Sequence, residues 1–158
     1  MSGECDDSSG TFEIAGLRDG EWTLSATAPG FVPASLPPVS IPGDSSSLMI
    51  VMRRAATLSG IVVDESGNPV PNVFVYAPPP WEELRAGNKN RNLFAATTRT
   101  DPQGGFTLQD VEPGPVRLRA DSYQWVTVDP IPLEAKAGQT MAGLRVTVVP
   151  IDSRERKN

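Results

Sequence analysis

The sequence predicts an all-β protein whose strands form an antiparallel sandwich of the Greek-key type. Glycine and proline contribute 14 and 16 of the 158 residues, an excess that favours many short strands and turns. Apolar residues alternate with polar ones over short stretches, and no long stretch has helical periodicity. Clusters of turn-forming residues separate these stretches at regular intervals, which is typical of two packed sheets.

The elements follow in order along residues 55–150, where about seven strands are expected. Asp64–Pro69 and Asp101–Gly105 have the composition of tight turns, since Asp and Ser bond nearby backbone and Gly allows positive φ. Val116–Ala120 alternates apolar residues with arginine, as a strand with one wet face should. One helical turn is expected at residues 81–85. The expected strands cover residues 57–63, 70–77, 94–100, 106–108, 116–120, 126–133 and 144–149.

The chain also contains an internal repeat. Phe12 aligns with Phe106 at an offset of 94 residues, and the same offset preserves apolar, Gly and Pro positions without a gap. The matched pairs include Gly20 with Gly114, Leu24 with Leu118, Ala26 with Ala120, Phe31 with Trp125, Pro38 with Pro132 and Met52 with Val146. We therefore expect a partial unit at residues 1–54 that holds only the back half of a sandwich, a complete unit at residues 55–150, and a polar tail at residues 151–158.

A half sandwich exposes apolar faces and unpaired strand edges, and this exposure lowers the stability of the folded state. The chain is therefore expected to be an excerpt whose upstream strands are lost. Two alternatives remain open: a second copy supplies the missing strands, or the partial unit pairs irregularly with the complete one.

Charge and composition exclude several functions. The net charge of −5 argues against a nucleic-acid partner, which needs a basic face. The chain has no histidine and one cysteine, Cys5, so it has no histidine base, Ser-His-Asp triad, Cys-cluster zinc site or intrachain disulfide. We expect no catalytic residue, metal or cofactor. No apolar run approaches the roughly 20 residues of a membrane span, and the acidic start Met1–Asp7 is not a signal peptide.

Residues Ser59–Val75 resemble the opening of bacterial carboxypeptidase regulatory-like domains. Thr100–Phe106, Val111–Gly114 and Leu118–Ala120 continue that resemblance. It implies a transthyretin-like (prealbumin-like) sandwich, also grouped with carbohydrate-binding-like folds, and an extracytoplasmic place in bacteria: periplasmic, cell-surface or secreted. Such domains usually occur in tandem or beside other domains of a longer protein. Peptidase activity is not implied, because its zinc site needs histidines. The expected function is a non-catalytic spacer or adhesion and interaction module.

A carbohydrate-binding module is the alternative function. The loop at residues 77–92 is far longer than a hairpin turn, and such loops are often functional or disordered. Trp81 would stack on a sugar ring or enter a partner protein's apolar groove, and Asn88 and Asn90 would bond sugar hydroxyls. Tyr123 is a second aromatic candidate. A sugar site predicts at least two exposed aromatic side chains on one concave surface, whereas a spacer predicts isolated or buried ones.

Each of these features also has a purely structural interpretation. Trp81 would fold back over an edge of the sandwich. Trp125 and Trp22 would pack in a core, because Phe31 and Leu24 share their positions or parity in the repeat. The turn carboxylates, Asp64 and Asp101 among them, would bond backbone N–H groups rather than calcium.

Overall fold

The computed structural model describes residues 9–43, 48–80 and 96–151. Contacts divide the chain into two compact units. The first unit comprises Met1–Ala26 and Ala34–Val51, and the second comprises Thr27–Pro33 and Met52–Asn158. Residues 27–33 thus group with the second unit. Within the described ranges no helix is long and apolar enough to cross a membrane.

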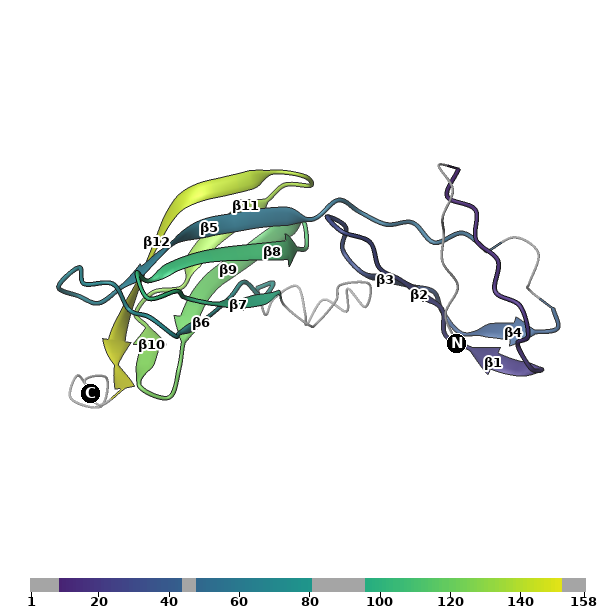
Figure 1. The fold of residues 1–158 in the computed structure, drawn as a ribbon, viewed down its shortest axis with the longest axis horizontal. Coiled ribbons are helices and arrows are strands. Elements are labelled where there is room, and N and C mark those ends of the chain that lie inside the picture. Colours follow the sequence, from purple (N-terminus) through teal and green to yellow (C-terminus); the bar gives the residue numbers. More distant parts are fainter. Residues whose placement is uncertain (1–8, 44–47, 81–95, 152–158) are drawn as a thin grey trace. The chain divides into compact units, whose positions relative to one another are not determined.

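The second unit is built from two four-stranded sheets (Figure 1). One sheet has the order β10-β12-β5-β8 and the other has the order β11-β9-β6-β7. The strands are β5 (Ala56–Val63), β6 (Phe74–Tyr76), β7 (Thr97–Arg99), β8 (Gly105–Val111), β9 (Gly114–Asp121), β10 (Trp125–Thr127), β11 (Ile131–Ala135) and β12 (Thr140–Pro150). The predicted all-β class is confirmed.

The prediction of one strand over residues 126–133 is wrong. The chain makes two strands there, because it leaves one sheet and enters the other. Trp125–Thr127 pairs with β12, whereas Ile131–Ala135 pairs with β9. Pro130 stands between them and has no N–H to donate to a ladder, so it suits the crossing point.

The expected strand over residues 70–77 is shortened to β6. Asn72 takes a left-handed conformation with φ of 58°, which interrupts the extended chain after Pro71. Beyond the kink the alternation is as predicted. Val73 and Val75 are both fully buried, and Phe74 between them is exposed.

One strand pair departs from an antiparallel sandwich. β12 runs parallel to β5, with a bulge between Met141 and Leu144. Gly60 of β5 faces Leu144 across this pair, and a Cβ at Gly60 would lie 1.9 Å from the Leu144 carbonyl oxygen. Glycine is therefore required at this point for the two backbones to approach so closely.

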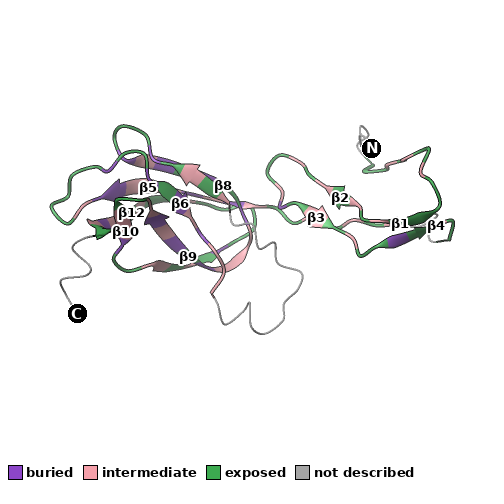
Figure 2. Cartoon of the chain, turned by 90° about the horizontal axis from the view of Figure 1, so that it is seen from below, coloured by how far each residue is buried: buried purple, intermediate pink, exposed green. Residues whose placement is uncertain are grey.

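The core of the second unit lies between the two sheets. β9 shows the pattern most clearly, with Val116, Leu118 and Ala120 buried and Arg117 exposed. Trp125 is partly buried against the core, as expected. Figure 2 shows the buried positions on the strands of this unit. The core residues are Ala56, Leu58, Val62, Val70, Val73, Val75, Ala77, Phe106, Leu108, Val111, Val116, Leu118, Ala120, Ala135, Val146 and Val148.

Two turns use their aspartates as predicted. Asp64 Oδ1 accepts bonds from the N–H groups of Ser66 and Asn68 at 2.9 and 2.8 Å. Asp101 Oδ1 accepts bonds from the N–H groups of Gln103 and Gly105 at 2.9 and 2.8 Å. These bonds hold the turns that lead out of β5 and into β8.

The first unit contains two short antiparallel pairs. β1 (Gly20–Trp22) pairs with β4 (Val39–Ile41), and β2 (Ser25–Ala26) pairs with β3 (Ala34–Ser35). Val39 is buried, whereas Trp22 is only partly buried and donates its Nε1–H to the Arg18 carbonyl at 2.9 Å. Trp22 is therefore not enclosed in the way that a core position would require.

Candidate functional site

The outer face of the sheet β11-β9-β6-β7 carries the most distinctive side chains of the second unit. Phe74 and Tyr76 project there because they alternate with the buried Val73 and Val75. The strand register places Phe74 between Arg99 of β7 and Asp121 of β9. We call this surface, made of Phe74, Tyr76, Arg99, Arg119 and Asp121, the aromatic face.

Phe74 and Arg99 form the exposed part of the aromatic face. The Arg99 guanidinium carbon lies 4.0 Å from the centroid of the Phe74 ring, a cation–π distance. Arg99 also donates a hydrogen bond of 2.6 Å to Asn72 Oδ1. These contacts hold a flat cation over a ring that remains 42% exposed. The pair offers an apolar surface and guanidinium donors side by side.

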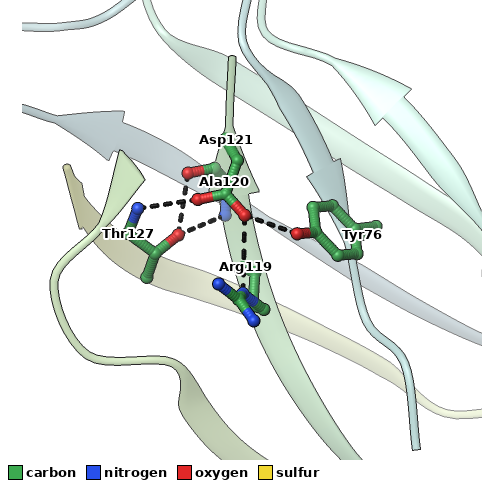
Figure 3. A network of polar contacts seen from close by, with 5 residues as sticks. All are labelled: Tyr76, Arg119, Ala120, Asp121 and Thr127. Atoms are coloured by element: carbon green, nitrogen blue, oxygen red, sulfur yellow. Dashed lines mark hydrogen bonds and ion pairs between the residues drawn. The ribbon is translucent and has the colours of Figure 1, made fainter. Parts of the chain in front are cut away.

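Tyr76 and Asp121 form the half-buried part (Figure 3). The Tyr76 hydroxyl donates a hydrogen bond to Asp121 Oδ2, and Arg119 Nε lies 3.4 Å from the same oxygen. Burial, followed by the bond to Asp121 and the charge of that carboxylate, raises the pKa of Tyr76 above its ordinary value of 10.0. Tyr76 is therefore a neutral hydrogen-bond donor at neutral pH.

Asp121 also joins the two sheets. Its Oδ1 accepts a bond of 2.8 Å from the N–H of Thr127, which belongs to β10 of the opposite sheet. Thr127 is 1% exposed, and its hydroxyl accepts from the Ala120 N–H and donates to the Ala120 carbonyl, both at 2.7 Å. Figure 3 shows these contacts converging on the end of β9. Both oxygens of the Asp121 carboxylate thus take part in contacts that hold the structure together.

The aromatic face combines a fixed polar network with an exposed aromatic–guanidinium pair. Both oxygens of Asp121 accept hydrogen bonds, from the Tyr76 hydroxyl and from the Thr127 N–H. Over the ranges that the structure describes, no cluster of three or more acidic, Cys or His side chains is arranged to hold a metal. Phe74 and Arg99 are suited to non-covalent contacts through an apolar ring and guanidinium donors.

The structure describes one of the four predicted site residues. Trp81, Asn88 and Asn90 lie outside the described residues. Tyr123 lies in the turn between β9 and β10 and is 98% exposed. It follows Asp121 by two residues, and Asp121 is the register partner of Phe74, so both aromatic residues belong to the same end of this sheet.

Sequence reasoning missed Phe74, Tyr76 and Arg99. The strand parity that places Val73 and Val75 in the core also places Phe74 and Tyr76 outside, so a signal for the two rings was present. The sequence around Arg99 does not indicate that this side chain lies over Phe74, because the contact depends on the register between β6 and β7.

The profile of the carboxypeptidase regulatory-like domain matches residues 57–149, more than half of the chain. The chain belongs to the carboxypeptidase regulatory-like domain family. Members of this family are non-catalytic domains. The matched segment coincides with the eight strands described for the second unit, which we now call the regulatory-like domain.

Comparison with solved structures finds matches of low sequence identity. One is the 3-chlorocatechol 1,2-dioxygenase of Rhodococcus opacus 1CP, with 14% identity, a TM-score of 0.43 and coverage of 61% of this chain. Another is a minor pilin of the gram-positive pathogen Streptococcus agalactiae, with 12% identity, a TM-score of 0.40 and coverage of 91%. This chain spans 60% and 66% of the lengths of those two chains. Comparison with curated protein sequences finds no match.

Proposed function

We propose that the chain is a non-catalytic β-sandwich module that acts as a structural spacer, or as an adhesion and interaction domain, in a larger bacterial extracytoplasmic protein. The observation that carries this proposal is the parallel pairing of β5 with β12. β5 begins the regulatory-like domain and β12 ends it, so the chain enters and leaves along two neighbouring strands that run in the same direction.

This geometry determines how tension passes through the domain. The pairs run from Thr57 with Thr140 to Val63 with Thr147. A pull between the two ends of the domain acts along both strands in opposite directions, so it loads the ladder hydrogen bonds in shear. All of these bonds resist together, whereas a pull that separates the strands from one end breaks them one at a time. A domain loaded in shear is a stiff connector.

The extent of β12 sets the distance over which the domain separates its neighbours in the chain. β12 has 11 residues, and at about 3.3 Å per residue its ten steps span roughly 33 Å from Thr140 to Pro150. The core on the inner side of both sheets keeps this distance fixed, because core side chains are close-packed. A repeat of such domains would hold a binding surface at a set distance from its anchor.

Single-molecule force spectroscopy tests the proposal. The full chain is pulled from its two ends, and the force that unfolds the regulatory-like domain is compared with a second attachment geometry. In that geometry one handle is placed at residue 66, by Ser66→Cys in a Cys5→Ser background, and the other at the carboxyl end. Residue 66 follows the carboxyl end of β5, so this pull unzips β5 from β12. We expect a severalfold higher unfolding force for end-to-end pulling, and equal forces would refute the spacer role.

Carbohydrate binding is the second candidate, supported by Phe74 and Tyr123. Both side chains are exposed, at 42% and 98%, and both lie at the end of the sheet where Phe74 pairs with Asp121. Exposed rings beside the Arg99 guanidinium are suited to stacking on a sugar and donating hydrogen bonds to its hydroxyls. A glycan array with the full chain identifies a ligand, and titrations of Phe74→Ala and Tyr123→Ala follow.

The matched control for these titrations is Val128→Ala, which removes an apolar side chain that is 39% exposed and outside the aromatic face. Loss of binding in both aromatic variants, with binding retained in the control, supports the sugar site. No response to any glycan on the array rejects it.

A further inference from the structure

The β1–β4 ladder of the first unit has the same register as the β9–β11 ladder of the regulatory-like domain. β1 pairs Gly20 with Ile41 and Trp22 with Val39. Adding the repeat offset of 94 gives Gly114 with Ala135 and Val116 with Leu133, and these are pairs of β9 with β11. The agreement extends over all three pairs of the β1–β4 ladder.

The backbone conformation repeats at the same offset. Gly10 and Gly104 have φ of 75° and 74°. Gly16 has φ of 77°, and its counterpart Asp110 has φ of 59°, one of only two positive values at non-glycine residues in the described ranges. Positive φ is unfavourable for aspartate, so its presence at this position indicates a shared turn geometry.

The two units differ in what covers their apolar face. Leu108 of β8 and Leu118 of β9 are fully buried in the regulatory-like domain, where β5 lies between β8 and β12 and adds Leu58 and Val62 to the same core. Their counterparts in the first unit, Ile14 and Leu24, are only partly buried, although they keep the same alternation along the chain. These counterparts and their neighbours line a groove of about 570 Å³. Its lining comprises the apolar residues Phe12, Ile14, Leu17, Trp22, Leu24, Val39, Ile41 and Leu48, together with Gly10, Thr11 and Glu13.

An apolar edge lies beside this groove. Residues 48–51 correspond to residues 142–145 of β12, where Leu144 and Arg145 pair in parallel with β5. In the first unit the described residues of this segment lie outside any strand, and Met49 and Val51 are 75% and 69% exposed. The segment is apolar on both of its alternating faces, a pattern typical of a strand that is covered on both sides.

We propose that the groove of the first unit binds an extended polypeptide segment with the side-chain pattern of β5, added as a parallel strand along residues 48–51. In the regulatory-like domain that place is held by β5, which directs Leu58 and Val62 into the core and has glycine where the backbones approach. The occupant therefore needs bulky apolar residues at alternate positions and a glycine between them. Strand addition of this kind draws affinity from main-chain bonds and specificity from alternate side chains.

Charge favours the same class of occupant. The described residues of the first unit include Glu13, Asp19 and Glu21 but a single cation, Arg18. An acidic segment would be repelled, whereas β5 has no charged residue between Ala56 and Val63. The proposed partner is thus an uncharged, alternating β-strand segment.

A peptide with the sequence of residues 55–63, which carries no charged side chain, is labelled with a fluorophore and tests the proposal against the full chain by fluorescence anisotropy. We expect saturable binding. Two variants change the peptide and not the protein. Gly60→Val places a side chain where the backbones approach, and Ser59→Val places the same side chain one position away. The Gly60→Val peptide should bind at least about tenfold more weakly than the Ser59→Val peptide.

Variants of the chain locate the site. Leu24→Asp changes a groove-lining residue and should weaken peptide binding about tenfold, whereas Ser25→Asp changes the next residue along the chain, which is exposed, and should leave binding unchanged. Absence of saturable binding, or equal binding of the two variant peptides, would overturn the proposal. So would sedimentation showing that the chain dimerises through this groove and that Leu24→Asp abolishes the dimer, because the occupant would then be a second copy.

Discussion

Gly60→Ala is the most informative single change in the regulatory-like domain. Gly60 lies on β5 opposite Leu144 of β12, and the added methyl carbon would lie 1.9 Å from the Leu144 carbonyl oxygen and 2.6 Å from its carbon. Both atoms belong to the backbone, so no side-chain rotation removes the collision. β12 must retreat by about 1.5 Å, the difference between 1.9 Å and an ordinary contact of 3.4 Å.

The size of the effect follows from this retreat. Overpacking a well-packed interior typically costs about 1–3 kcal/mol, and a collision with backbone lies at the upper end of that range or beyond it. We therefore expect the free energy of unfolding to fall by about 3 kcal/mol. For a domain of this size that loss corresponds to a drop in Tm of roughly 12–24 °C. In an unobstructed strand the same change would be stabilising by about 0.5–1 kcal/mol, so even the sign is diagnostic.

Denaturation by guanidinium chloride, followed by the fluorescence of Trp125, measures this loss. Trp125 packs against the core of the regulatory-like domain, and Trp22→Phe with Trp81→Phe makes it the sole tryptophan. The matched control is Gly143→Ala on β12, where a Cβ meets nothing within 4 Å and φ is 75°. The control should lose about 1 kcal/mol from backbone strain alone. If Gly60→Ala loses no more than Gly143→Ala, close approach does not explain the glycine.

Three further predictions concern the polar contacts. Thr127→Val keeps the shape of the side chain but removes both bonds to the buried Ala120 backbone, so urea denaturation should show a loss of about 1–3 kcal/mol. Bonds from the Asn68 side chain and backbone lower the pKa of Asp64 below 3.8, so the stability it contributes is present above about pH 4 and lost as pH falls through the folded pKa. Denaturation curves of the wild type and Asp64→Ala should differ at neutral pH and converge in acid, and a constant difference would contradict this. The pKa of Tyr76 is raised, so its stabilising effect is intact below about pH 10 and lost as pH rises through the folded pKa. In a Tyr123→Phe chain, where Tyr76 is the sole tyrosine, phenolate absorbance should therefore appear above pH 10 and shift to lower pH on unfolding.

Local chemistry explains the predictions that are confirmed. The alternation in Val116–Ala120 reports which side chains face the core, because successive residues of a strand point to opposite sides. The turn at Asp64 forms from bonds within five residues, so its sequence is sufficient to specify it. Both features are decided within a short stretch of chain.

Long-range pairing explains the predictions that are wrong. Residues 126–133 read as one strand, because nothing within them reveals that Thr127 bonds one sheet and Ile131 the other. The parallel course of β12 beside β5 is likewise a contact between segments more than eighty residues apart. The glycine at position 60 is visible in the sequence, but the reason for it is the close approach of β12, which the neighbouring residues do not reveal.

The amino-acid sequence by itself determined the all-β class, the buried faces of β6 and β9 and the turns at Asp64 and Asp101, because each depends on the period of two or on bonds between near neighbours. Only the tertiary structure decided which strands are neighbours, and therefore that Arg99 covers Phe74, that Asp121 joins the two sheets and that the domain is entered and left along parallel strands. Register between distant segments is set by the packing of the whole core, and no short stretch of sequence contains it.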